Sequence, residues 1–224
     1  MLIFPKLVLG VVYPVGTVIL CGAKNITLTF QMGGTHSTKN LPKEEIKKLA
    51  TKTHFTEAQI RRWYKDFLKD CPSGLLNRST FLSMYTQFFP DGKARQFYEH
   101  LFRTFDADAS GNIDFTEFLT AISITQSGGP EEKLDLAFQL YDIDRNGTIE
   151  ESEMTQIIKA IHLMVGEVDD REGNSPAERT RAIFKKMDVN CDQVLTKEEF
   201  IQGCLSDEHL YRLLAQTKDG KKKT

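Results

Sequence analysis

Residues 106–117 read DADASGNIDFTE and residues 142–153 read DIDRNGTIEESE in this chain of 224 residues. Both stretches place an oxygen-bearing side chain at positions 1, 3, 5, 9 and 12 and a glycine at position 6. Calcium prefers about six to eight oxygen ligands, and a short loop with this spacing supplies them together with the backbone carbonyl of position 7. The repeat therefore predicts two sites for Ca²⁺.

The twelve-position pattern is that of the loop in an EF-hand, which a helix precedes and another helix follows. Gly111 and Gly147 provide the positive φ that position 6 favours. Ile113 and Ile149 at position 8 are expected to face inward and pair with a neighbouring loop. An acidic turn without a metal is the alternative, but too many carboxylates converge for a plain turn. The predicted ligands of loop 2 (106–117) and loop 3 (142–153) are Asp106, Asp108, Ser110, Asn112, Asp114, Glu117, Asp142, Asp144, Asn146, Thr148, Glu150 and Glu153.

A third copy of the pattern, named loop 4, spans residues 188–199 and reads DVNCDQVLTKEE. Gln193 stands at position 6, where a residue other than glycine costs roughly 1–2 kcal/mol, or about a factor of ten in affinity. Loop 4 is therefore predicted to bind calcium more weakly, and a folded loop that stays empty in the cell is the alternative. Its predicted ligands are Asp188, Asn190, Asp192, Val194, Thr196 and Glu199.

A degenerate copy, named loop 1, begins at Lys69 and ends at Thr80. A cation at position 1, no carboxylate at position 12 and the stiff Pro72 predict that loop 1 binds no calcium. EF-hands pack in pairs, so loop 1 is expected to support loop 2 by placing Leu76 beside Ile113. In total we predict two to three bound Ca²⁺ ions, with Mg²⁺ as an alternative occupant at rest.

The segments around the loops have the patterns of amphipathic helices. Thr56 and Gln59 form a capping-box signature at the start of one helix. Ser175, Pro176 and Glu178 mark another start, with a cap, a proline at the first position and an acid three residues after the cap. Met154, Ile157, Ile158 and Ile161 form an apolar stripe after loop 3.

These elements predict an all-α fold of four EF-hands in two paired lobes, with short two-stranded β contacts between the loops. Six segments follow: an atypical apolar N-terminal extension (1–31), an arm with a short helix (32–55), a first EF-hand pair (56–126), a linker (127–130), a second pair (131–205), and a C-terminal helix with a basic tail (206–224).

Composition excludes several classes of function. The formal net charge is only −2, which argues against a nucleic-acid partner. We find no nucleophile motif, Walker loop or dinucleotide fingerprint, so the chain is not predicted to be an enzyme. The four cysteines are widely scattered, which favours reduced thiols and a cytoplasmic location.

Aromatic residues concentrate in the first pair. Such residues form either the core or an apolar groove for a partner helix or a lipid chain, since sensor EF-hands expose such surfaces on binding calcium. We assign Phe102 and Phe105 to the core. Because a small lobe can bury only part of these aromatic residues, the excess favours a groove, which we assign to Trp63, Phe67, Tyr85, Phe88 and Phe89.

Residues from about 40 to 215 resemble the neuronal calcium sensor family, which includes the potassium-channel-interacting proteins. The likeness rests on KDCPSG at 69–74, FFP at 88–90, FRTFD at 102–106 and YD at 141–142. It implies four EF-hands, no catalysis, and a calcium-exposed groove for a target helix in a kinase, a cyclase or an ion channel. By the same resemblance the groove residues are Trp63, Phe67, Phe81, Tyr85, Phe88 and Phe89.

Met32 to Ser37 fit the myristoylation signal M-G-x-x-x-[ST]. Gly33 is a lipidation site only if Met32 is the start, because acylation requires a free N-terminal glycine. Residues 1–31 carry Lys6 and Lys24 and no acidic residue, which favours an upstream start. A membrane anchor, a disordered segment or small strand, and a signal peptide are alternatives, but Asn146-Gly-Thr148 as a glycosylation sequon on a calcium ligand weighs against secretion.

The sequence thus predicts a calcium sensor that exposes an apolar groove and regulates a target protein. We expect it to be cytoplasmic and reversibly associated with membranes, because one myristoyl chain binds only marginally. Lysines of the C-terminal tail either add about 1 kcal/mol each at an anionic leaflet or are simply solvated, as such tails more often are. A cytosolic calcium buffer, which needs ligands but no groove, is the alternative function.

Overall fold

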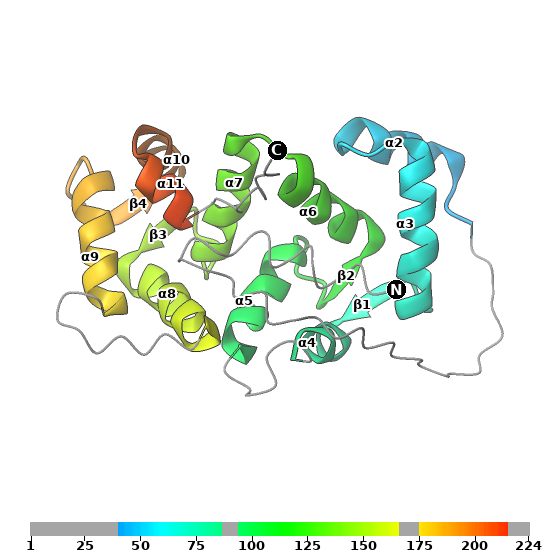
Figure 1. Ribbon diagram of the computed structural model, residues 1–224, viewed down its shortest axis with the longest axis horizontal. Coiled ribbons are helices and arrows are strands. Elements are labelled where there is room, and N and C mark those ends of the chain that lie inside the picture. The colour runs from blue at the N-terminus through cyan, green and yellow to red at the C-terminus, as the bar shows by residue number, and fades with distance from the viewer. Residues whose placement is uncertain (1–39, 87–93, 166–174, 215–224) are drawn as a thin grey trace, which may run out of the picture.

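A computed structural model describes residues 40–86, 94–165 and 175–214 of the chain. Its helices and short strands confirm the predicted all-α fold (Figure 1). The first part of the chain forms α2 (Lys43–Lys52), α3 (Glu57–Asp70), β1 (Leu75–Asn77), α4 (Arg78–Thr86), α5 (Arg95–Phe105), β2 (Asn112–Asp114) and α6 (Phe115–Ser127). The second part forms α7 (Pro130–Tyr141), β3 (Thr148–Glu150), α8 (Glu151–Val165), α9 (Pro176–Met187), β4 (Val194–Thr196), α10 (Lys197–Ser206) and α11 (Glu208–Leu214).

Side-chain caps fix where two of the helices begin. Thr56 accepts a hydrogen bond from the amide of Gln59, whose side chain in turn accepts from the amide of Thr56. Ser175 and Glu178 form the same reciprocal pair ahead of α9, with Pro176 at the first position. Both predicted starts are confirmed, because each cap satisfies amides that a helix leaves without partners in its first turn.

Two antiparallel ladders join the loops in pairs. β1 pairs with β2, so that Leu76 lies opposite Ile113, and β3 pairs with β4, so that Ile149 lies opposite Leu195. All four side chains are fully buried. The prediction that position 8 faces inward and pairs with the neighbouring loop is therefore confirmed.

The core confirms the apolar pattern of the helices. Phe102 and Phe105 are buried, as assigned. The apolar stripe of α8 is buried at Met154, Ile157, Ile158 and Ile161. In the described ranges no helix is long and apolar enough to cross a bilayer.

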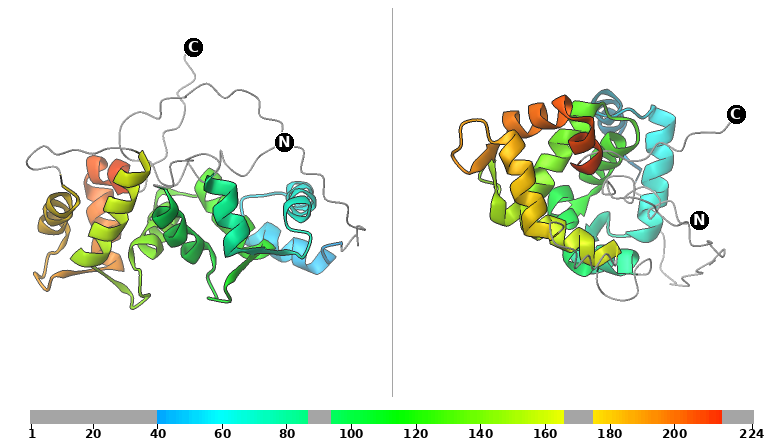
Figure 2. Two further views of the ribbon diagram at one scale, coloured as in Figure 1. Left: turned by 90° about the horizontal axis from the view of Figure 1, so that it is seen from below. Right: turned by 60° about the vertical axis from the view of Figure 1, so that its left-hand side comes forward.

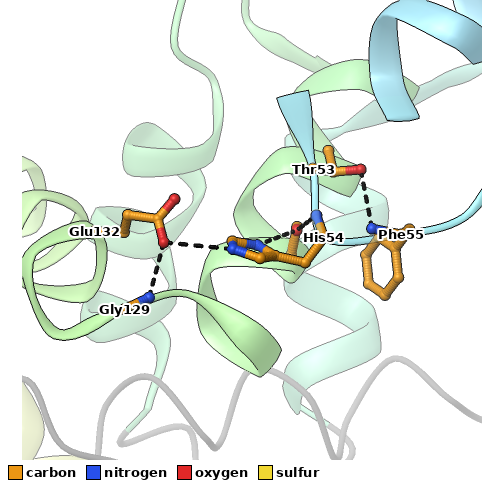
Figure 3. A network of polar contacts seen from close by, with 6 residues as sticks. Thr53, His54, Phe55, Gly129 and Glu132 are labelled. Carbon is orange, nitrogen blue, oxygen red and sulfur yellow. Dashed lines mark hydrogen bonds and ion pairs between the residues drawn. The ribbon is translucent and has the colours of Figure 1, made fainter. Parts of the chain in front are cut away.

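The two pairs lie side by side along the longest axis, with α2 and α3 at one end and α9 at the other (Figures 1 and 2). Between them α5 contacts α7 and α8, and α6 contacts α7. His54, which precedes α3, also reaches across (Figure 3). Its amide donates to Ser123 Oγ at 2.7 Å, and its Nε2 lies 3.6 Å from Oε2 of Glu132 on α7.

Candidate metal centres

Loop 2 gathers three predicted ligands from distant positions of its sequence. Carboxylate oxygens of Asp106, Asp108 and Glu117 lie within 4.8 Å of one another. Asp106 follows the last turn of α5, and Glu117 lies in the first turn of α6. The end of α5 and the beginning of α6 thus bring the side chains at positions 1 and 12 of the loop together. Hard oxygens so grouped fit Ca²⁺.

Loop 3 repeats this arrangement. Asp142, Asp144 and Glu153 also bring carboxylate oxygens within 4.8 Å of one another. Asp142 and Glu153 are each only 6% exposed. Buried carboxylates are costly unless they are paired or hydrogen-bonded, and both of these accept hydrogen bonds from backbone amides of their own loop.

The remaining predicted ligands of the two loops make polar contacts within their own loops. Ser110 donates its hydroxyl to the carbonyl of Asn112 at 2.9 Å, and Thr148 donates its hydroxyl to Asn146 Oδ1 at 2.7 Å. Asp114 accepts the amide of Glu117 at 2.8 Å and so caps α6. Further contacts of this kind are Asn146 Nδ2 to Asp144 at 3.1 Å and the Ser152 hydroxyl to Glu150 at 3.1 Å.

In loops 2 and 3, the glutamate at position 12 accepts hydrogen bonds from amides at the beginning of its loop. Glu117 Oε1 accepts the amides of Ala107 at 2.9 Å and Asp108 at 3.2 Å, while Oε2 accepts that of Asp114 at 2.9 Å. In loop 3, Glu153 Oε1 accepts the amides of residues 143 and 144 at 2.8 and 3.1 Å. The position-12 carboxylate is therefore the link between loop and exiting helix.

Local surroundings shift two carboxylate pKa values in loop 2. Burial raises the pKa of Glu117, against the hydrogen bonds from the amides of Asp114 and Asp108 that lower it. Hydrogen bonds from Ser110 lower the pKa of Asp108. Glu117 therefore binds its proton more tightly than an ordinary glutamate does.

A conformational feature at position 4 was missed from the sequence. Ala109, Arg145 and Cys191 occupy position 4 of loops 2, 3 and 4, and their φ values are 57°, 61° and 59°. Non-glycine residues adopt this left-handed conformation uncommonly. In loop 1 the same position holds Pro72, whose ring fixes φ near about −65° and forbids the turn. The proline at this position of loop 1 was the signal in the sequence that could have pointed to the special conformation of position 4.

Loop 1 also lacks a usable ligand at position 3. Cys71 is 3% exposed, and burial, with a smaller contribution from Asp70, raises the pKa of its thiol to about 12. The thiol therefore stays protonated at neutral pH, and sulfur is in either form not the oxygen ligand that Ca²⁺ takes. This supports the prediction that loop 1 binds no calcium and serves as the strand partner of loop 2.

Loop 4 has the same turn but a looser closure. Gln193 at position 6 has φ 69°, the strained value expected from the sequence. Asp188 accepts the amides of Asp192 and Gln193 at 3.2 and 3.0 Å, and Asn190 accepts that of Asp192 at 2.9 Å. Val194 lies on β4.

Glu199 marks the difference between loop 4 and the other two loops. It accepts the amide of Thr196 at 3.0 Å, as position 12 does elsewhere. Over residues 188–199, all of them described, no hydrogen bond joins Glu199 to the amides of positions 2 and 3. The triad of carboxylates at positions 1, 3 and 12 also has no counterpart in loop 4, because Asn190 stands at position 3. The missing closure and the missing charge both agree with weaker binding.

The predicted groove residues that the structure describes lie in an aromatic cluster. Phe67 and Phe81 are 0% and 1% exposed, and Trp63 is partly buried. The ring centroid of Phe118 lies 6.0 Å from that of Trp63 and 5.3 Å from that of Phe67. Phe81 packs on Phe102 with centroids 5.4 Å apart. The side chain of Tyr85, and the residues Phe88, Phe89 and Gly33, lie outside the described part.

Comparison with known proteins agrees with this geometry. A family model for an EF-hand domain pair matches residues 131–205, and one for a single EF hand matches residues 98–122. S-modulin from Aquarana catesbeiana is 40% identical over 187 residues, which cover 82% of this chain and 92% of that protein. Human recoverin is 38% identical over 185 residues, covering 81% and 92%.

Proposed function

The chain belongs to the neuronal calcium sensor family, whose members are calcium sensors rather than enzymes, and from this membership we propose a specific switch. Calcium binding at loops 2 and 3 exposes an apolar groove in the first pair, and the groove binds a helix of a target protein. The resemblance offers a kinase, a cyclase or an ion channel as the target.

The proposal rests on the packing of Phe118 against α3. Glu117, the position-12 ligand, is followed directly by Phe118, and both lie in the first turns of α6. Phe118 packs on Trp63 and Phe67 of α3. Calcium coordination replaces the hydrogen bonds that Glu117 makes to its own loop. A shift of Glu117 therefore moves Phe118 away from two of the proposed groove residues.

The proposed loops differ in strength. Loops 2 and 3 each carry four carboxylates at ligand positions and close through position 12. Loop 4 carries three and lacks that closure, so we propose two tight sites and a weaker third. Mg²⁺ is the proposed occupant at resting calcium, because it shares the preference for oxygen ligands.

Trp63, the sole tryptophan of the chain, makes the switch measurable. We expect calcium to shift its fluorescence emission and to increase the binding of an apolar dye, because Trp63 and Phe67 lose Phe118 as a neighbour. The Glu117→Gln variant should respond to calcium at loop 3 but show a reduced emission shift. A chain that binds calcium without either optical change would be a buffer, the alternative function.

Reversible membrane contact is part of the proposal and depends on Gly33. If translation starts at Met32, the mature chain begins at Gly33 and carries a myristoyl group, which by itself gives marginal, reversible membrane binding. Such a protein is proposed to be cytoplasmic. Intact mass of the native protein is expected to match residues 33–224 plus one myristoyl group, and a mass that includes residues 1–31 would contradict this start.

A further inference from the structure

Arg145 extends from loop 3 to the backbone of loop 2. It occupies position 4 of loop 3, yet its guanidinium donates to carbonyls of the first pair. Nη2 donates to the carbonyl oxygens of Arg103 and Asp106, the latter at 2.6 Å, and Nη1 donates to that of Ala107 at 3.4 Å. The guanidinium thus holds the carboxyl end of α5, where loop 2 begins.

Arg103 makes the reciprocal contact. It lies in the last turn of α5, and its guanidinium donates to carbonyls at the carboxyl end of α7. Nη1 donates to the carbonyl of Asp142 at 2.7 Å, and Nη2 donates to those of Leu140 at 2.8 Å and Gln139 at 3.3 Å. Each arginine therefore binds the backbone of the position-1 ligand in the other loop, and a cation is favourable at each helix end.

The reach of Arg145 depends on the folded shape of loop 3. Its backbone has φ 61°, and the next amide, that of Asn146, donates to both Asp142 and Asp144 at 3.1 Å. These carboxylates are predicted calcium ligands. An ion that binds these carboxylates therefore also fixes the turn that directs the side chain of Arg145 toward loop 2.

We infer that Arg103 and Arg145 are positioning residues that couple calcium binding at loop 2 to calcium binding at loop 3. The inference rests on the proposed calcium sites. An ion in loop 3 holds the side chain of Arg145 in place, and Arg145 in turn holds the backbone at the beginning of loop 2. Arg103 makes the equivalent connection from the end of α5 to the beginning of loop 3. Such coupling is reciprocal, and its usual size is about 5- to 150-fold in affinity.

The test follows each loop separately in a calcium titration of the full chain. The amide resonances of Gly111 and Gly147 report loops 2 and 3, because both amides bond to a ligand carboxylate. The coupling factor is the loss of loop 2 affinity caused by Glu153→Gln. We expect about fivefold or more in the natural sequence. In the Arg145→Ala background the same substitution should change loop 2 affinity less than about twofold.

Arg145→Ala is a mild change because loop 2 itself carries alanine, Ala109, at position 4 with nearly the same φ. Loop 3 should therefore still bind calcium. Arg62→Ala, an exposed arginine on α3, is the matched control and should leave the coupling intact. Coupling between loops 3 and 4, which the β3–β4 ladder carries, should also persist.

The outcomes separate this inference from the calcium sites on which it rests. Undiminished coupling in Arg145→Ala would overturn the role assigned to Arg145 while leaving calcium binding in place. Failure of both glycine resonances to respond to calcium would instead overturn the proposed sites. Arg145→Lys keeps the charge but loses the forked donor, so its coupling is expected to lie between that of the natural sequence and that of Arg145→Ala.

Discussion

Glu153→Gln is expected to weaken calcium binding at loop 3 from the sensor range of about 10⁻⁷–10⁻⁵ M to roughly 10⁻⁴–10⁻³ M. The substitution removes a charged, bidentate ligand at position 12. Glutamine keeps the shape, and its carbonyl oxygen can still accept the amide of Ile143, which Glu153 accepts at 2.8 Å. The fold should therefore survive. Titration followed at the Gly147 amide measures the effect.

Glu151→Gln is the control for charge. Glu151 lies in the same first turn of α8 but is exposed and is not a predicted ligand. It should change the affinity of loop 3 less than about threefold, since exposed charges are strongly screened. Equal losses in both variants would mean that net charge and not coordination by Glu153 decides affinity.

Phe118→Ala is expected to lower the free energy of unfolding of the first pair by about 3–5 kcal/mol. Phe118 is 1% exposed, and its ring packs against Trp63 and Phe67. Truncation removes these contacts and leaves a cavity that the surrounding rings fill only partly. Urea denaturation in the presence of a calcium chelator, followed by Trp63 fluorescence, measures the change.

Leu75→Ala is the control in the same pair. Leu75 lies at position 7 of loop 1 and is 47% exposed, so its truncation should change stability by less than about 0.5 kcal/mol. A loss below about 1 kcal/mol in Phe118→Ala would contradict the packing that we assign to Phe118, and with it the connection from Glu117 to the groove.

The sequence alone did not divide the aromatic residues of the first pair between the core and a groove. Their excess in the first pair favoured a groove, and the resemblance assigned Phe67 and Phe81 to it, yet both are buried. A groove that opens on calcium binding and a closed core need the same apolar residues, so composition does not separate them. The packing of Phe118 on α3, which the sequence alone did not contain, is the contact on which the proposed link between loop 2 and the groove rests.

The amino-acid sequence by itself determined where the loops lie, the helix caps and the pairing of Leu76 with Ile113, and it predicts the ligand types and the inactive first loop. These features depend on residues within one twelve-residue loop or on the regular pairing of neighbouring EF-hands. The tertiary structure decided the open closure of loop 4 and the bridge from Arg103 and Arg145. The contacts of this bridge join residues 36 to 42 positions apart and depend on how two helix ends meet, which no local pattern encodes.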